Sequence, residues 1–319
     1  MTPVETTQLL IQLFGIGFLT TTVRLATPLL LGALGAAVSE RAGVLNVGIE
    51  GMMLVGAFFG SAVTVWSGSL WLGLVAAAAA GLATALVFAF FCVTLKTNQI
   101  VTGLIINILA LGVTSLLLRV LFPGQSWDTK TSGFPLITIP FLKDIPILGP
   151  MLFDRQEPLT YLALLLTLAI WYMLYRTRFG LSLRAVGEYA RAADSVGINV
   201  SLMRYAGTMV SGAMAGLGGA FISLSVVRLF QDNMIQGRGF IALAVVIFGK
   251  WHPFGIVVAA LVFGAAQSLE FRIQTTSLDI PAQLPAMLPY FLTLIALAGL
   301  VGKSTPPAED GIPYVREEA

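Results

Sequence analysis

Apolar runs separated by short polar links make up most of the chain. A run of about 20 apolar residues is long enough to cross the hydrocarbon core of a bilayer as a helix. The pattern therefore predicts an all-α integral membrane protein, a polytopic helical bundle with about nine transmembrane spans. The spans are expected at about residues 25–38, 52–66, 71–95, 99–122, 158–175, 203–227, 240–249, 254–269 and 284–301.

The first apolar run is longer than the others. Residues 9–37 are almost all apolar, but Arg24 and Pro28 interrupt them. As one helix they would be about 44 Å long, well over the ~30 Å thickness of the hydrocarbon core. We therefore expect residues 7–23 to form an oblique or interfacial helix that leads into the first span, with Arg24 reaching the outer headgroups.

Residues 39–53 are too polar and too rich in glycine to face lipid. Irregular backbone at membrane depth is tolerated only where it is buried in protein or lines a water-filled cavity. We expect Asn46, Gly48, Glu50 and Gly51 to form a broken helix start that is buried in the bundle.

Small residues are concentrated in the span at residues 203–227. Gly212 and Gly216 lie four residues apart, and so do Ala215 and Gly219. Small residues at this spacing let helices approach closely in lipid.

Two polar segments lie outside the spans. Residues 123–157 contain five prolines and no long apolar run, so we expect an ordered or semi-ordered external loop. From residue 303 the chain is polar and contains prolines, and we expect residues 303–319 to form a frayed cytoplasmic tail.

The polar link at residues 176–204 is the longest one that is also basic. It contains five of the eighteen Lys and Arg residues and two acids. Basic residues close to span ends are retained on the cytoplasmic side of a membrane. This link therefore sets the predicted topology, in which the amino end is outside and the carboxyl end is inside.

Residues 187–196 of this link are predicted to form a short helix. Gly187 can serve as its N-cap, Glu188 complements the positive end of the helix dipole, and Gly197 can adopt the left-handed closing conformation. About ten residues do not hold a helix alone in water, so this one must dock on the chain's own spans or on a separate cytosolic protein. The mildly apolar face that would dock consists of Tyr189, Ala192, Ala193 and Val196.

Composition supports the membrane assignment and narrows the functions. The chain is 57% apolar and 11% charged, whereas soluble domains carry about 25% charged residues, and its mean hydropathy is +0.88. The net charge of +2, without a basic tract that contains aromatics, argues against nucleic-acid binding. The single cysteine, Cys92, excludes an internal disulfide, and the single histidine, His252, cannot form a metal cluster by itself.

Constellations typical of enzymes are missing from the sequence. There is no nucleophile with a base, no carboxylate pair at coherent spacing, and no Gly-rich phosphate loop that ends in Gly-Lys-Ser/Thr. We therefore expect no catalytic residues, no metal and no cofactor in this chain, and any ATP and Mg to be bound by partner subunits.

Six polar residues in or beside the spans could line a translocation pathway, and each has a structural alternative. Glu50 could lie near a pore entrance, or it could bond to neighbouring backbone and Arg41 at a helix start. The amides could line a path or only join helices, and Gln267 could belong to a solvated span end. The candidates are Asn46, Glu50, Asn98, Gln99, Asn107 and Gln267.

Several stretches resemble one family of transporters. Residues 184–199 read Arg-Ala-Val-Gly-Glu-Tyr-Ala-Arg-Ala-Ala-Asp-Ser-Val-Gly-Ile-Asn. With residues 172–180, they resemble the cytoplasmic coupling loop of ATP-binding-cassette (ABC) importer permeases of the branched-chain amino acid and ribose type. Residues 39–53, 97–103 and 239–253 look like the nucleoside and simple-sugar subgroup. The resemblance covers about residues 20–300.

This resemblance implies an architecture and a set of partners. Residues 1–302 would form a single transmembrane permease domain in the bacterial inner membrane. The domain would assemble with a second related permease subunit, two cytosolic ATPases and an extracytoplasmic binding protein, and it would translocate neutral nucleosides or simple sugars. The residues implied in coupling to the ATPases are Gly187, Glu188, Ala192, Ala193, Asp194 and Gly197.

Three alternatives remain at this point. The same architecture could carry branched-chain amino acids. An ion-coupled secondary transporter would need an ionisable relay in mid-membrane, yet residues 70–95, 99–118 and 284–301 contain no acid or histidine. A structural or signalling membrane protein would need no pathway at all.

Overall fold

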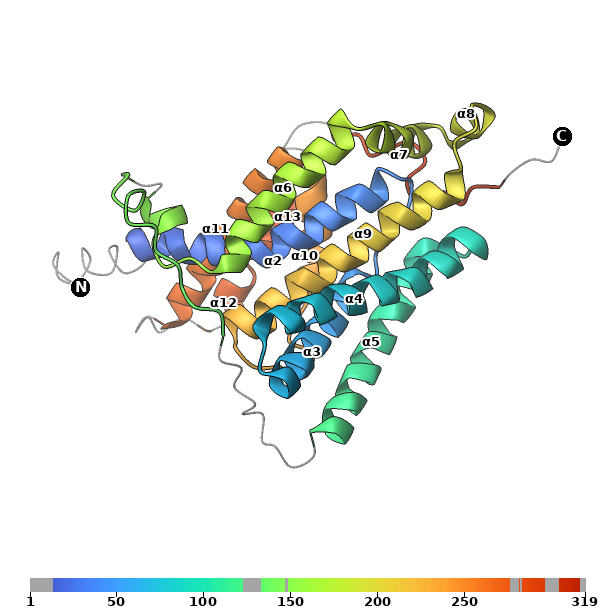
Figure 1. Ribbon diagram of the computed structural model, residues 1–319. Coiled ribbons are helices and arrows are strands. Elements are labelled where there is room, and N and C mark those ends of the chain that lie inside the picture. Colours follow the sequence, from blue (N-terminus) through green and yellow to red (C-terminus); the bar gives the residue numbers. More distant parts are fainter. Residues whose placement is uncertain are drawn as a thin grey trace.

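A computed structural model describes residues 14–122, 133–146, 149–275, 281, 283–295 and 304–315, except the side chains of Pro150 and Ile295. These residues form an all-helical bundle without a named strand (Figure 1). The one β-type pairing among them is an isolated bridge between Ile137 and Gln156. The predicted fold class, an all-α membrane bundle, is confirmed.

The helices of the described residues differ widely in length. Three short π-helical segments, η1 (Phe90–Thr94), η2 (Gly149–Phe153) and η3 (Ile222–Val226), occur among them, and η1 and η3 extend the preceding helices. The α-helices are α2 (Ile16–Glu40), α3 (Ile49–Ser67), α4 (Leu70–Ala89), α5 (Gln99–Leu121), α6 (Pro158–Arg176), α7 (Arg178–Glu188), α8 (Ala190–Ser195), α9 (Val200–Phe221), α10 (Arg238–Phe248), α11 (Pro253–Thr275), α12 (Gln283–Ala286) and α13 (Leu288–Ile295).

Seven helices of the described chain are long and apolar enough to cross a membrane: α2, α3, α4 with η1, α5, α6, α9 with η3, and α11. The other two predicted spans stay without confirmation. α10 has 11 residues, about 16 Å of helix, which is half of a ~30 Å core. α13 has eight described residues, and residues 296–301 of the predicted last span lie outside the described residues.

Helix α2 corrects the prediction for the first apolar run. It runs unbroken for 25 residues through Arg24 and Pro28, so the expected division between residues 7–23 and 25–38 is wrong, and residues 7–13 lie outside the described part. The reason is a partner far away in the chain. Arg24 Nη2 donates to Glu157 Oε1 over 2.5 Å and to the Ser225 carbonyl oxygen over 2.6 Å, so its charge is neutralised within the protein instead of reaching headgroups.

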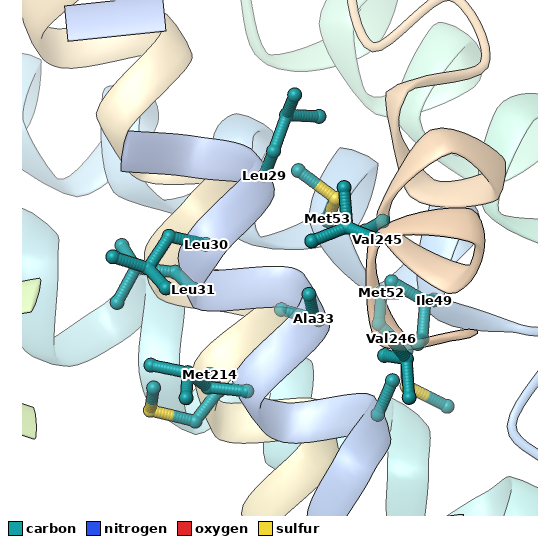
Figure 2. Packing of buried hydrophobic residues seen from close by; sticks show 14 of the residues in the cluster. Leu29, Leu30, Leu31, Ala33, Ile49, Met52, Met53, Met214, Val245 and Val246 are labelled. Carbon is teal, nitrogen blue, oxygen red and sulfur yellow. The ribbon is translucent and has the colours of Figure 1, made fainter. Parts of the chain in front are cut away.

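Helices α2 and α9 form the centre of the bundle. α9 lies against α2, α3 and α4, and α2 also contacts α10 and α11 (Figure 1). In Figure 2, Leu30, Leu31 and Met214 lie on one side of α2, and Met53 and Val245 lie on the other, all within one buried cluster. α4 (with η1), α5 and α6 are outer helices, because only 33%, 28% and 33% of the residues in an apolar 18-residue stretch of each are buried.

The small residues of α9 allow this close packing. A Cβ atom added to Gly216 would lie 2.2 Å from the Ala77 carbonyl oxygen of α4. One added to Gly219 would lie 1.8 Å from the Met53 carbonyl oxygen of α3. The predicted role of the four-residue spacing, close helix approach, is confirmed.

Helix α10 is a half-length helix that begins inside the bundle. After η3 the chain turns back through residues 227–237, where Phe230, Met234 and Ile235 are buried. α10 ends beside the ends of α2 and α6, because Trp251 donates to Glu40 and the His252 ring lies 5.2 Å from that of Tyr175. The apolar run at residues 240–249 was predicted as a span, and the 11 residues of α10 leave that prediction without confirmation.

Replacing Gly216 by leucine tests the packing at the bundle centre. The added side chain has no room against α4, so we expect a loss of stability of about 1–3 kcal/mol or more, as for overpacked cores. Gly112→Leu on α5 is the matched control, because a Cβ there would meet nothing within 4 Å. The measurement is the midpoint of thermal unfolding in detergent. Equal midpoints for the two variants would contradict the close contact of α9 with α4.

Candidate functional site

Residues 176–204 form two helices where the sequence predicted one. α7 ends at Glu188 and α8 covers only Ala190–Ser195, with Tyr189 as its N-cap residue. Gly187 is therefore not an N-cap, since it lies in the last turn of α7. Gly197 has φ +86°, the left-handed conformation expected for it at the end of the segment.

Gly187 and Glu188 hold the end of α7 against the end of α2. A Cβ atom on Gly187 would lie 2.2 Å from the Arg41 carbonyl oxygen, so only glycine permits this contact. Glu188 Oε1 lies 3.7 Å from Arg41 Nη1. The glutamate therefore pairs with an arginine after α2 and does not complement the start of a helix, as the sequence had suggested.

The adjacent alanines Ala192 and Ala193 of α8 differ in exposure. Ala193 is 3% exposed and packs against Val186, Ala190 and Val200 of its own chain. Ala192 is exposed, as are Tyr189 at 58% and Val196 at 75%. These three residues form the outward face of this segment, and Ala193 does not belong to it.

Residues 304–315, which the sequence predicted to be frayed, are docked beside α7, α8 and the start of α9 (Figure 1). We call this end of the bundle the α8 end. Glu309 N donates to the Gly187 carbonyl oxygen over 2.9 Å, and Tyr314 Oη to Asp194 Oδ2 over 3.0 Å. The tail thus contacts two of the predicted coupling residues.

Arg204 anchors this tail from within the bundle. Arg204 is 1% exposed. Its Nη1 donates to the Ile312 carbonyl oxygen over 2.7 Å, and its Nη2 lies 3.8 Å from Glu309 Oε2. Burial raises the pKa of the nearby Asp310 carboxyl from 3.8 to about 7. A buried arginine needs such partners, and the tail supplies them.

Four of the six pathway candidates serve to hold helices and backbone together. Asn46 is fully buried and donates to Ser211 Oγ over 3.0 Å. Gln99 Oε1 accepts from Leu45 N over 2.7 Å. Asn107 accepts from Gly51 N and donates to the Val47 carbonyl oxygen. Asn98 Oδ1 caps α5 by accepting hydrogen bonds from Ile100 N and Val101 N.

Glu50 caps the buried start of α10. Its two carboxylate oxygens accept from Gly237 N over 2.7 Å and from Gly239 N over 2.6 Å. The predicted alternative, in which Glu50 bonds to neighbouring backbone and Arg41, is wrong about the partners, because the backbone groups it bonds belong to Gly237 and Gly239. The expectation of a broken, buried helix start at residues 46–51 agrees with the structure, because Asn46, Gly48 and Gly51 are all buried.

Gln267 is the one pathway candidate that lines a cavity of about 590 Å³. The cavity lies between α2, α10, α11 and the segment of α12 and α13. Gln267, Glu270, Phe271 and Gln274 line it from α11, at a helical spacing that could have been read from the sequence. The remaining lining residues are Thr21, Arg24, Leu25, Val226, Gln236, Arg238, Ile241, Ala286, Pro289 and Tyr290.

The ionised groups around this cavity compensate one another. Arg24 pairs with Glu157. Arg238 Nη1 donates to the Met234 and Ile235 carbonyl oxygens over 3.2 and 3.1 Å, and its charge interacts with Glu270 and Glu50. The cavity therefore offers mainly neutral amide, hydroxyl and aromatic groups to a solute. Within the described residues no group of three His, Cys, Asp or Glu side chains is placed to hold a metal.

Comparison with known proteins decides the family. The family described as "Branched-chain amino acid transport system / permease component" matches residues 18–297. The chain belongs to this family. It is 42% identical over 299 residues to the guanosine ABC transporter permease protein NupQ of Bacillus subtilis. This alignment covers 91% of this chain and 94% of the relative.

Other relatives carry related names. The nucleoside ABC transporter permease protein NupC of Lactococcus lactis is 37% identical, over 92% of this chain and 95% of the relative. The glucose ABC transporter permease protein TsgB13 of Haloferax volcanii is 26% identical, over 86% and 74%. B. subtilis and L. lactis each have a second, less similar relative, NupP at 28% and NupB at 24% identity.

A solved structure shares the fold. It is an inward-facing ABC transporter of the metal-chelate type, with a TM-score of 0.52 and 16% identity, covering 94% of this chain and 91% of that chain. At this identity the likeness concerns the fold alone. The chain is thus a multi-pass membrane protein of an ABC permease family.

Arg204→Ala tests the anchoring of the tail. The variant removes the bond to Ile312 and the pairing with Glu309, so residues 304–315 should open more often. Hydrogen exchange of the peptide that contains Glu309 and Ile312 should become about tenfold faster, which corresponds to about 1.4 kcal/mol. Arg178→Ala, an exposed arginine of α7, is the matched control. Unchanged exchange in Arg204→Ala would contradict the anchoring.

Proposed function

We propose that this chain is the transmembrane permease subunit of an ATP-driven importer that translocates nucleosides or simple sugars. The observation that carries the proposal is the 42% identity to a guanosine permease over 91% of the chain. Relatives named for nucleoside and glucose transport support the same substrate range. Branched-chain amino acids remain the alternative substrate, because the family is described by them.

The proposed assembly contains a second permease subunit. The presence of two related permease proteins of unequal similarity in B. subtilis and in L. lactis supports a heterodimer. Two cytosolic ATPase subunits would bind ATP and Mg, and an extracytoplasmic binding protein would deliver the solute. This chain would supply neither catalysis nor a cofactor site.

The proposed setting is the inner membrane of a bacterium, with the α8 end in the cytosol. The excess of basic residues in the 176–204 link supports this orientation. The described tail lies at the same end of the bundle, so a cysteine placed at Ser304 should be protected from an impermeant thiol reagent on intact cells. Labelling of that cysteine would reverse the proposed orientation.

The charge balance of the cavity favours a neutral substrate. A zwitterion such as leucine would need compensation for its carboxylate and its ammonium group, yet Arg24 already pairs with Glu157, and the charge of Arg238 is offset by those of Glu270 and Glu50. A neutral nucleoside or sugar can exchange its hydrogen bonds to water for bonds to amides and hydroxyls without burying a charge.

The outward face of Tyr189, Ala192 and Val196 is the proposed contact with an ATPase subunit. Of these residues Ala192 lies in the six-residue helix α8, and Tyr189 and Val196 flank it. A helix this short needs contacts to be stable, and an exposed apolar face of this kind is suited to fit a groove on another protein. Ala193 would hold α8 onto its own chain.

The decisive experiment is ATP-dependent uptake by the purified complex in proteoliposomes, with its binding protein. Labelled guanosine, ribose, glucose and leucine should be compared at equal concentration. We expect uptake of guanosine or a sugar and none of leucine. Uptake of leucine alone would overturn the substrate class, and proton-dependent uptake by the chain without any ATPase would overturn the importer assignment.

Ala192→Glu tests the contact with the ATPase. A buried interface charge costs several kcal/mol, so ATP-driven uptake should fall about tenfold or more while the amount of permease in the membrane stays the same. Ala308→Glu places the same side chain at an exposed position of the tail and should leave uptake unchanged. Ala193→Glu is unsuitable, because that alanine is buried. Normal coupling in Ala192→Glu would rule out docking on this face.

A further inference from the structure

The cavity lies beside an interruption of regular structure inside the bundle. Residues 227–237 form bends and turns instead of a helix between η3 and α10, and Arg228, Asn233 and Gln236 have positive φ values of 61°, 54° and 51°. Non-helical backbone at membrane depth is tolerated where it lines a cavity or is buried in protein. Half-helices that start in the membrane mark solute sites in many transporters. Gln236 and Arg238 place this interruption on the cavity wall.

Two buried polar atoms of cavity-lining residues have no hydrogen-bond partner among the described residues, Arg24 Nε and Gln267 Oε1. Gln267 is 8% exposed, and its Oε1 accepts no hydrogen bond from any of the described residues. A buried polar atom without a partner costs about 1–3 kcal/mol. The other buried amides of the sequence candidates, those of Asn46 and Gln99, are bonded within the protein. Gln267 therefore differs from them in having a side-chain oxygen that no described residue bonds.

Two aromatic rings accompany this amide on the cavity wall. Phe271 follows Gln267 by one helical turn, and Tyr290 lies on α13. They are 59% and 55% exposed, so their rings are open to contact. The volume of about 590 Å³ falls within the range of small-molecule sites, about 300–1,000 Å³.

We propose that this cavity is a solute subsite of the translocation pathway, which binds a neutral nucleoside through the amide of Gln267 and the rings of Phe271 and Tyr290. A glutamine amide can bond to the edge of a nucleobase, and aromatic rings stack on its face. The charges of the lining residues are already offset, Arg24 by Glu157 and Arg238 by Glu270 and Glu50, which disfavours a zwitterion. The inference rests on the proposed function, because it concerns the route of the same solute.

A cysteine at Ala286 reports occupancy of this cavity. Ala286 lines the cavity, and the substitution by cysteine is small. In a Cys92→Ala background, the rate of alkylation of this cysteine is measured in the complete complex without nucleotide, with guanosine, glucose or leucine added at millimolar concentration. We expect guanosine to slow alkylation and leucine to leave it unchanged.

Gln267→Leu identifies the group that binds. It should weaken the protection by guanosine about fivefold, the effect of one neutral hydrogen bond, while the alkylation rate without solute stays the same. Gln231→Leu is the matched control, because Gln231 is exposed and lies outside the cavity. Its protection should equal that of the parent protein.

The possible results separate the subsite from the proposed function. Guanosine uptake by the complex without any protection at Ala286→Cys would overturn the subsite and leave the importer assignment standing. Protection by leucine to the same degree would overturn the argument from paired charges, and protection by glucose alone would overturn the nucleoside assignment. Full protection in Gln267→Leu would remove that amide from the site.

Discussion

Backbone N–H groups that start a helix inside a bilayer must find acceptors within the protein, and this requirement shapes the centre of the bundle. Glu50 meets it for α10 with both carboxylate oxygens. The starts of α3 and α10 are therefore held face to face, although 187 residues separate Glu50 from Gly237. The irregular segment before α10, and with it one wall of the polar cavity, depends on this contact.

The sequence predicted the features that depend on local pattern. The apolar runs predicted most of the long helices, because span length and composition are local properties. The buried start at residues 46–51 followed from its glycines and polar groups. Features that depend on distant partners were missed. A lone Arg24 in an apolar run suggests a helix end, but Glu157, 133 residues away, lets α2 continue through it. The apolar run at residues 240–249 could not show that it begins at a capped site inside the bundle.

The same distinction applies to the candidate site. Residue type singled out amides and an acid near the spans, but type does not show which partner each one finds. Asn46, Gln99 and Asn107 bond to backbone or side chains of other segments. Gln267 alone among the buried amide candidates keeps an acceptor without a described partner. The sequence signal for the cavity was the helical spacing of four residues on one face of α11, which composition alone does not reveal. These residues are Gln267, Glu270, Phe271 and Gln274.

The docked tail has a consequence for the order in which the molecule can be built. Residues 304–315 follow every other described element in the chain, so they leave the ribosome after α7, α8 and α9 have been made. Until then Arg204 lacks the Ile312 carbonyl oxygen and Glu309, and the Gly187 carbonyl oxygen lacks its donor. A nascent chain therefore cannot present the finished α8 end to a partner. Readiness of the α8 end for assembly therefore waits for the synthesis of residues 304–315.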